Sequence, residues 1–490
     1  MEVLKPLLGS SFRSPQALDA LSQLVLGYAG KPLDLLYSRI GGLNGRFFPQ
    51  GWGNLGIVNL REDIELIKQG AWASEGIKVN WKLLQQGSWE GVPYKLYEGT
   101  YRTPCVDRIY DALPLESRTG RVQLLMPAAG LGATQLQAGS QPLFSKHHTP
   151  GAVLHLAATG DHGFSRRLRL GAPLLQQGVC QLVHESPYYG ARRPPQQRGS
   201  KLCAVSDLLA LGWATIYESL CLLAWLEAEG VEQRGICGLS MGGVHACMTA
   251  GLYPRPLAIT PLLTPRSAAV AYCDGALAPL MAWRALLQEK DMADNEQLEQ
   301  QLEAVEGTLD LWQQQQQQHQ PSAQQQQEEA QSIEAVAAVQ QAAALAAVTE
   351  AAAAEQLIVD NQQQQQHQQQ QQLDLGWKGS AGLAAMGRQQ TKAPPADTFR
   401  RLRHVLETYT DVTRYPRPVR PDAAVLVAAR HDGYVDTASV KALQEHWPGS
   451  ELRMVNGGHV SAFLMHQDAF RAALRDSLAR LEAGTPAAGG

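Results

Sequence analysis

Short apolar runs alternate with longer stretches of mixed apolar and polar residues along most of this chain. Short apolar runs bounded by turn residues are typical of strands buried in a sheet, and the longer stretches between them are typical of helices. The alternation predicts an α/β protein with a doubly wound, mostly parallel sheet. The predicted strands are Arg121–Met126, Ala152–Leu156, Cys180–His184, Arg234–Leu239, Leu257–Ile259, Ala423–Ala429 and Glu451–Val455.

The longest apolar stretch, Leu208–Glu229, is predicted to be a helix. Its first part is the only segment that approaches the composition of a membrane span, but Glu218 interrupts it and acidic residues flank it. A charge in the middle of a span is costly in a bilayer, so we expect a buried crossover helix and no transmembrane segment. Further helices are expected after Gly242 and over Thr398–Arg414 and Thr437–Trp447.

Four regions follow from this pattern. Residues 1–120 are predicted to be an α-rich extension leading into the first strands, and residues 121–274 and 396–482 the two parts of one core. Residues 275–395 carry glutamine runs and an alanine-rich stretch, which offer too little apolar surface to offset chain ordering. We expect a mostly disordered insertion at the position of a cap, with at most one helix, across the alanine-rich stretch Ala335–Ala354. We prefer an inert expanded tract to an ordered substrate lid.

The overall charge and the cysteines limit the class of protein. The formal net charge is −4, which gives no electrostatic basis for general nucleic-acid binding. The seven cysteines are odd in number and lack C-x-x-C spacing, which argues against a disulfide framework or a zinc site. We expect an intracellular reducing compartment. The first thirty residues fit no signal peptide and only partly a transit peptide, which leans toward a mitochondrion or another organelle.

The segment Gly238-Leu239-Ser240-Met241-Gly242 has the pattern G-x-S-x-G, between a predicted strand and a predicted helix. A serine hydroxyl is a weak nucleophile unless it is exposed on a sharp turn beside a base and near backbone donors. Glycines on both sides leave room for the helix to cross close to the strand. The pattern predicts Ser240 as a nucleophile, in preference to an ordinary turn serine.

Two further residues complete a triad. Asp432 follows the strand Ala423–Ala429, and His459 follows Glu451–Val455. The chain order Ser, Asp, His, with both partners just past the ends of strands, is that of the α/β-hydrolase arrangement. Asp436 competes with Asp432, but it precedes a predicted helix and is better explained as its N-cap.

An acyl-transfer intermediate carries an oxyanion, which needs two backbone N–H donors held in place before the reaction. One is expected from Met241, the residue after the nucleophile. The other is expected in the loop after Ala152–Leu156, where Thr159 is the first choice and Gly160 the close alternative. The same small residues would also suit a plain strand-to-helix turn.

Arginines and tyrosines gather in the loops after two of the strands. If they converge over the elbow, they would bind an anionic head group, because guanidinium groups bind phosphate in a bidentate manner. The alternative is that they are solvated charges or structural ion pairs. The candidate substrate-binding residues are Arg166, Arg167, Tyr188, Tyr189, Arg192 and Arg193.

Several longer motifs together resemble those of the alpha/beta-hydrolase domain-containing protein 18 family. They span nearly the whole chain except residues 275–395. One departure is Asp436, where similar sequences usually have proline. The resemblance implies a serine-hydrolase fold and lipid acyl-ester chemistry. The matching stretches include Leu33-Asp34-Leu35-Leu36-Tyr37, Glu98-Gly99-Thr100-Tyr101-Arg102-Thr103-Pro104, His155-Leu156-Ala157-Ala158-Thr159-Gly160-Asp161-His162, Glu185-Ser186-Pro187-Tyr188-Tyr189-Gly190, Gly238–Gly243 and Gly457-Gly458-His459-Val460-Ser461-Ala462.

The residues and the resemblance together favour a serine ester hydrolase that uses no metal and no cofactor. We expect a lipid or other ester substrate, with a phospholipid or lysophospholipid favoured, peripheral membrane association, and no nucleic-acid partner. Two alternatives stay open. One is a catalytically silent scaffold with the hydrolase fold, and the other is an acyltransferase or thioesterase on the same fold.

Overall fold

The computed structural model describes residues 30–42, 45–70, 72, 77–128, 151–288 and 396–484. One compact unit comprises Met1–Gln313 and Ala393–Gly490. The second unit, Gln314–Lys392, lies outside the described residues. The expected disorder of the glutamine runs, the helix across the alanines and the question of a lid therefore all fall on residues that the structure does not describe.

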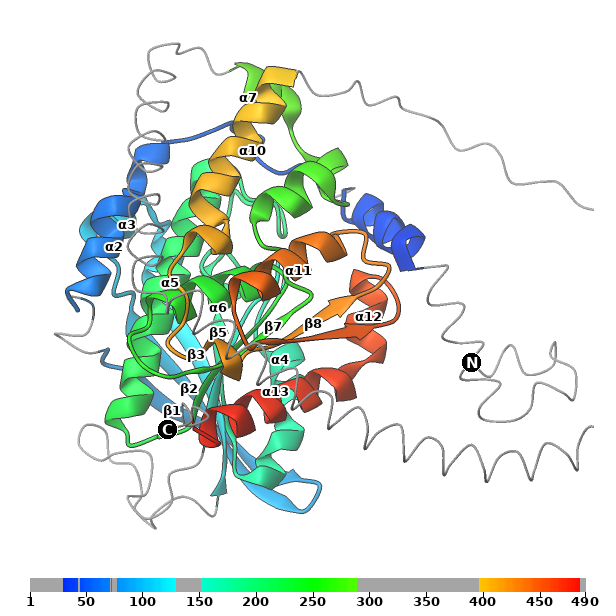
Figure 1. Ribbon diagram of the computed structural model, residues 1–490. Coiled ribbons are helices and arrows are strands. Elements are labelled where there is room, and N and C mark those ends of the chain that lie inside the picture. The colour runs from blue at the N-terminus through cyan, green and yellow to red at the C-terminus, as the bar shows by residue number, and fades with distance from the viewer. Residues whose placement is uncertain are drawn as a thin grey trace, which may run out of the picture. The chain divides into compact units, whose positions relative to one another are not determined.

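A nine-stranded sheet forms the centre of the described unit, with the strand order β1-β2-β3-β5-β4-β6-β7-β8-β9 (Figure 1). The strands from β5 to β9 are parallel, and β1, β2 and β3 are antiparallel to their neighbours. The predicted doubly wound, mostly parallel sheet is confirmed. The strands are β1 (Asn80–Trp89), β2 (Val92–Arg102), β3 (Thr119–Pro127), β4 (Ala152–Leu156), β5 (Cys180–Glu185), β6 (Arg234–Leu239), β7 (Ala258–Leu262), β8 (Val425–Ala429) and β9 (Glu451–Val455).

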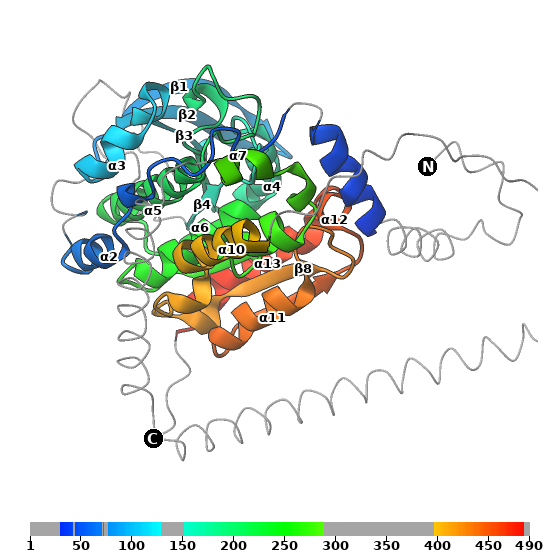
Figure 2. The ribbon, with the colours of Figure 1, turned by 90° about the horizontal axis from the view of Figure 1, so that it is seen from above.

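Helices cover both faces of the sheet, with α5 and α6 on one side and α13 on the other (Figures 1 and 2). Alternate residues of the strands supply the two cores. In β8, for example, Leu426 packs toward α5 and α6, and Val427 packs toward α13. The helices are α2 (Leu60–Lys68), α3 (Asp107–Ala112), α4 (Ser165–Gly171), α5 (Val205–Ala228), α6 (Met241–Leu252), α7 (Trp283–Gln288), α10 (Ala396–Thr410), α11 (Thr437–His446), α12 (His459–Met465) and α13 (Gln467–Glu482).

The hairpin of β1 and β2 corrects the α-rich description of residues 1–120. These two long strands form one edge of the sheet, and the same region of the chain also contains the helices α2 and α3. Almost every residue of β1 is exposed, so the strand lacks the apolar alternation that reveals a half-buried strand. The signal available in the sequence is the pair Glu90-Gly91 between the two strands. In the structure these two residues form the turn, with positive φ values of 47° and 87°. Such a two-residue turn suits a hairpin.

The start of the insertion also needs correction. The sequence predicts it from residue 275, but residues 275–288 belong to the folded unit. Ala276, Leu280 and Met281 are buried, and the backbone N–H of Phe47 donates to the carbonyl of Leu280 at 2.9 Å. This stretch still carries core-forming apolar residues, and the glutamine runs begin only later in the chain.

The helices on either side of the undescribed segment meet in space. Trp283 in α7 and Phe399 in α10 have ring centroids 5.9 Å apart. The last described helix before this segment and the first described helix after it therefore pack against each other.

The central helix α5 is buried, as predicted. It is long and apolar enough to cross a membrane by length and composition, but 89% of its most apolar window is buried inside the protein. Glu218 in its middle is fully buried and accepts hydrogen bonds from Arg192 at 2.6 Å and Tyr101 at 3.0 Å. Oε2 of this carboxylate, which accepts from Tyr101, also lies 2.5 Å from Nε2 of His184. Burial alone would raise the pKa of Glu218, but Arg192 and His184 lower that pKa to about 2.

We predict that Arg192→Ala lowers the free energy of unfolding by about 3–5 kcal/mol, because it leaves the Glu218 carboxylate buried without its cation. Urea unfolding followed by circular dichroism measures the loss. In the wild type, the stabilising effect of Glu218 should be complete above pH 4.5, its ordinary pKa, and should be lost as the pH falls toward 2.

Arg169→Ala serves as the matched control, because Arg169 is an exposed arginine of α4. It should leave the free energy of unfolding nearly unchanged. Equal stability of the two variants would contradict a structural role for Arg192.

Candidate active site

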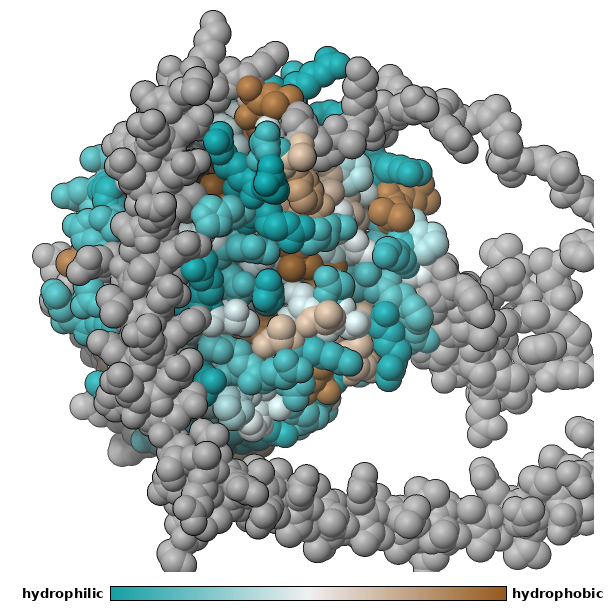
Figure 3. Space-filling model, turned by 45° about the horizontal axis from the view of Figure 1, so that its top comes forward, coloured by the Kyte–Doolittle hydropathy of each residue, from teal (hydrophilic) through white to brown (hydrophobic). Residues whose placement is uncertain are grey.

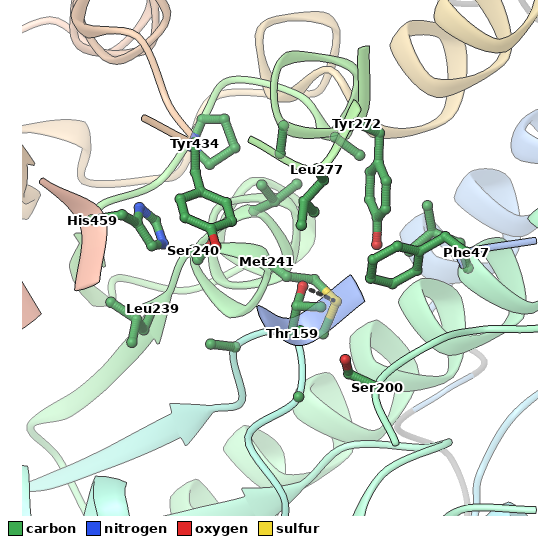
Figure 4. A pocket seen from close by; sticks show the side chains of 18 of the residues that line it. Phe47, Thr159, Ser200, Leu239, Ser240, Met241, Tyr272, Leu277, Tyr434 and His459 are labelled. Carbon is green, nitrogen blue, oxygen red and sulfur yellow. Dashed lines mark hydrogen bonds between the residues drawn. The ribbon is translucent and has the colours of Figure 1, made fainter. Parts of the chain in front are cut away.

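Ser240 stands at the turn between β6 and α6, in a backbone conformation that is rare for a residue with a side chain. Its φ is 54° and its ψ is −117°. The turn is fixed from both sides: the N–H of Ser240 donates to the carbonyl of Leu262 at 2.8 Å, and its carbonyl accepts from Gly243 at 2.9 Å. The strained turn raises the hydroxyl above the end of the sheet, where it lines a cavity (Figure 4).

The glycines of the motif are required by close backbone contacts. A Cβ atom at Gly238 would overlap the carbonyl group of Gly242, and one at Gly243 would overlap the hydroxyl of Thr264. A Cβ atom at Gly242 would lie 2.6 Å from the carbonyl oxygen of Leu156, at the end of β4. Helix α6 can begin this close to the sheet only because these positions carry no side chain.

Asp432 and His459 form a short hydrogen bond, with Nδ1 of the imidazole 2.7 Å from Oδ2 of the carboxylate. The other carboxylate oxygen accepts from the N–H groups of Tyr434 and Val435 at 2.8 and 2.9 Å. The imidazole points toward Ser240 across the floor of the cavity (Figure 4). The structure thus brings together the three residues predicted as a triad.

Asp436 has the separate role predicted for it. Its side chain accepts a hydrogen bond from the N–H of Ser439 at 2.6 Å and caps the start of α11. The two neighbouring aspartates are therefore divided between the histidine and a helix end.

The charges around His459 favour its protonated form. Burial lowers the pKa of the imidazole, but the charge and hydrogen bond of Asp432, aided by the charge of Asp34, raise it above its ordinary 6.5. An imidazole stabilised in this way accepts a proton readily from a neighbouring hydroxyl.

Asp34 is a component of the site to which the sequence analysis gives no role. Its carboxylate is fully buried and accepts three backbone N–H groups: Gly433 at 2.9 Å, His459 at 2.6 Å and Val460 at 3.0 Å. One side chain from the helix at residues 30–42 therefore joins the loop of the aspartate to the loop of the histidine. The available signal was the motif around Asp34, in which the aspartate is the one acidic residue.

The residues expected to supply the oxyanion donors line the same cavity as Ser240. Met241 is the first residue of α6, so its N–H group has no acceptor within the helix. Thr159 and Gly160 both line the cavity, and the hydroxyl of Thr159 lies 3.5 Å from the sulfur of Met241. The loop after β4 thus packs against the elbow, and the choice between Thr159 and Gly160 stays a prediction.

The cavity in front of Ser240 has a volume of about 610 Å³. Its walls come from the helix at residues 30–42, the loops after β4 and β5, helices α5, α6 and α12, and the region of the π-helix Val270–Asp274. Apolar side chains form most of this lining, among them Phe47, Leu208, Leu209, Trp213, Val244, Met248, Leu277, Leu280 and Phe463.

Most of the arginines and tyrosines predicted to bind substrate are placed elsewhere. Arg167 is buried, pairs with Asp161 at 2.8 Å and donates to the carbonyls of His155, Gly163 and His184. Arg192 is held by Glu218, as described above. Each arginine donates hydrogen bonds to buried carbonyl groups and to a carboxylate. These partners account for its burial, so the structure favours a structural role over substrate binding.

The remaining members of that set divide between surface and core. Arg193 is exposed and lies outside the cavity lining. Tyr188 and Tyr189 are buried in the core, and neither lines the cavity. Only Arg166, which is exposed, belongs to the cavity wall.

Lys201 provides a second positive charge in the cavity, and the sequence analysis does not identify it. The residue is only 6% exposed, and its ammonium group lies 4.1 Å from the ring centroid of Phe47. Burial lowers its pKa to about 8, and no carboxylate among the described residues offsets that effect. Figure 4 shows the hydroxyl of Tyr272 pointing into the same end of the cavity, beside Phe47.

We predict that Asp34→Asn moves the acidic limb of the kcat/KM profile for a soluble ester to lower pH. The substitution removes a negative charge that raises the pKa of His459. It should also lower the free energy of unfolding by about 1.5–3 kcal/mol, because the charged acceptor of three N–H groups is lost. Initial rates across pH and urea unfolding measure the two effects.

Asp63→Asn is the matched control, since Asp63 is equally buried but pairs with Arg108. It should lower the stability and leave the pH profile in place. The same profile for both variants would reduce Asp34 to a structural role.

Comparison with known proteins gives distant likenesses to solved structures and one match to a family model. Among solved structures, an acetyl xylan esterase from Paenibacillus sp. is 12% identical, with 86% of this chain and 97% of that chain covered and a TM-score of 0.38. An enol-lactonase from Burkholderia xenovorans is 13% identical, with 74% and 97% covered and a TM-score of 0.31. These likenesses are slight, and the assignment rests on a family match instead.

The sequence model of the family described as "Alpha/beta hydrolase domain containing 18" matches residues 45–480. The match includes the elbow, the loop of Asp432 and the loop of His459, and it begins after Asp34. The chain belongs to this family of α/β hydrolases.

Proposed function

We propose that the protein is a serine hydrolase that cleaves a carboxylic ester through an acyl-enzyme. The observation that carries the proposal is the 2.7 Å hydrogen bond between Asp432 and His459, with the imidazole facing Ser240 on its strained turn. This is the arrangement in which a serine becomes a nucleophile.

Each residue of the triad has a role that follows from its hydrogen bonds. The ionised carboxylate of Asp432 has no proton to donate, so Nδ1 of His459 carries the hydrogen and Nε2 is left to accept one. Ser240 Oγ attacks the acyl carbonyl while Nε2 takes its proton, and the protonated imidazole then returns that proton to the leaving alcohol. Water releases the acyl group from Ser240 by the same steps.

The oxyanion of the tetrahedral intermediate would be stabilised by the N–H of Met241 and a second N–H from Thr159 or Gly160. The first is expected to lie near the reacting carbon because it belongs to the residue after the nucleophile. Such donors are fixed before the reaction and are worth about 3–4 kcal/mol each when removed.

The cavity supports a lipid ester as substrate. Its volume of about 610 Å³ and its mostly apolar walls suit an acyl chain. Arg166 and Lys201 add positive charge to the same wall and support an anionic group on the substrate. A phospholipid or lysophospholipid combines the two features.

We expect a fluorophosphonate probe to label the wild-type protein and not Ser240→Ala. The probe forms a bond to an activated serine only where a base and an oxyanion site are present. Mass spectrometry of the labelled peptide identifies the residue. Absence of labelling in a folded wild-type protein would favour the silent scaffold, and a label on another serine would refute the assignment of Ser240.

Substitution of two neighbouring aspartates tests which of them belongs to the triad. Asp432→Asn should lower kcat about 10⁴-fold, because the imidazole then adopts the wrong tautomer. Asp436→Asn should cost about 1 kcal/mol of stability or less through a weaker helix cap, with little change in kcat. The reverse order would move the triad to Asp436.

We predict that Lys201→Met lowers kcat/KM for an anionic phospholipid about tenfold or more and spares a neutral short-chain ester. A charge-assisted contact of about 1.5–3 kcal/mol gives a change of this size. The wild-type preference for the anionic ester should decrease as the pH rises past about 8, where the free Lys201 side chain loses its proton.

Lys441→Met is the control, because Lys441 lies on the exposed side of α11. It should leave both rates unchanged. Equal losses on the anionic and neutral esters after Lys201→Met would show that Lys201 supports the cavity wall and does not select substrate charge.

A further inference from the structure

Several large apolar side chains are exposed on two elements next to the triad. They come from the helix at residues 30–42 and from α12, and we call these six residues the mouth rim. Their exposed fractions lie between 44% for Leu33 and 66% for Leu464. The six residues are Leu33, Leu36, Tyr37, Ile40, Leu464 and Met465.

Half of the mouth rim lies at the opening of the cavity. Tyr37, Ile40 and Leu464 are each more than half exposed, and each also lines the cavity in front of Ser240. A side chain that is both exposed and part of the wall marks the place where the cavity meets the solvent. The apolar lining therefore reaches the outer surface at these three residues.

The two elements of the mouth rim are fixed to each other. They lie side by side in both ribbon views, the helix at residues 30–42 in dark blue and α12 in red (Figures 1 and 2). Asp34 binds the N–H groups of His459 and Val460, and a Cβ atom at Gly30 would lie 2.6 Å from the nitrogen of Gly458. The exposed apolar residues thus project from a well-supported base.

Basic residues lie beside the mouth rim, and the nearest exposed acid along the chain after α12, Asp468, pairs with Arg471 at 2.8 Å. Lys31 and Arg39 on the same helix are exposed, as is Arg166 at the cavity wall. The single acidic residue of the helix at residues 30–42 is Asp34, which is buried, and α12 contains none. Figure 3 shows a brown patch with teal residues beside it on the side of the molecule where this helix lies.

We propose that the mouth rim docks on an anionic lipid bilayer and brings the cavity opening to the membrane surface. Elements that carry exposed apolar side chains and basic residues, and no exposed acid of their own, have the features of a helix that lies in the interface of an anionic membrane. A second copy of the chain on this surface would close the cavity, whereas a bilayer would offer acyl chains to it. Delivery of substrate rests on the proposed function, and the docking itself does not.

Sedimentation with vesicles tests the docking, using the full chain carrying Ser240→Ala so that no lipid is cleaved. The chain should bind vesicles of phosphatidylcholine mixed with phosphatidylserine more tightly than phosphatidylcholine alone, and added salt should weaken the binding. Leu33→Ser and Leu36→Ser should each lower the affinity about tenfold, because each removes a side chain that the bilayer would bury. Lys31→Gln and Arg39→Gln should each lower it about fivefold on the anionic vesicles alone.

Leu115→Ser and Val419→Ser provide matched controls, since both are exposed apolar residues outside the mouth rim. Leu115 is 75% exposed and Val419 is 51% exposed. They should bind like the parent chain. Unchanged binding of the combined Leu33→Ser, Leu36→Ser and Met465→Ser chain would overturn the proposal. The proposal would also be overturned if, in size-exclusion chromatography, the parent chain eluted as a dimer and the combined variant as a monomer.

The same variants separate the docking from the proposed hydrolysis. With Ser240 intact, the combined variant should lose activity on vesicles and keep its rate on a soluble short-chain ester, because Leu33, Leu36 and Met465 lie outside the cavity lining. Vesicle binding without fluorophosphonate labelling would support the docking and refute the hydrolase. Loss of the soluble rate in the combined variant would contradict the assignment of these residues to a surface role.

Discussion

The backbone conformation at Ser240 is the constraint on which the rest of the site depends. A positive φ for a residue with a side chain costs about 1–3 kcal/mol and persists only when its surroundings allow nothing else. Here the surroundings are β6, its neighbour β7, and a helix that starts in contact with the end of β4. The bare positions at Gly238, Gly242 and Gly243 make that contact possible. The position of α6 thus fixes the backbone of Ser240, whose side chain lines the cavity.

The second half of the triad depends on a different kind of interaction. Asp432 and His459 stand on two loops that leave the neighbouring parallel strands β8 and β9, and the N–H of His431 donates to the carbonyl of Gly457 between these loops at 3.0 Å. The buried carboxylate of Asp34 adds a second link, from a helix at the other end of the chain. Because the same helix forms one side of the cavity opening, the geometry of the triad and the shape of the entrance are set by one element.

The sequence allowed the parallel strands and the triad to be predicted, because both leave local signals: apolar runs, a glycine-framed serine, and polar residues at strand ends. The missing parts depend on partners that are distant in the chain. Arg192 looks the same in a sequence whether it faces a ligand or Glu218, and Asp34 contacts a residue 399 positions away. Strand β1 is exposed along nearly its whole length, so no apolar periodicity reveals it.

The packing of α7 on α10 has a consequence for how these two helices keep their places. Their contact, such as that of Trp283 with Phe399, is made by described side chains of the folded unit. The position of each helix is therefore supported by direct packing on the other, and does not depend on their separation along the chain.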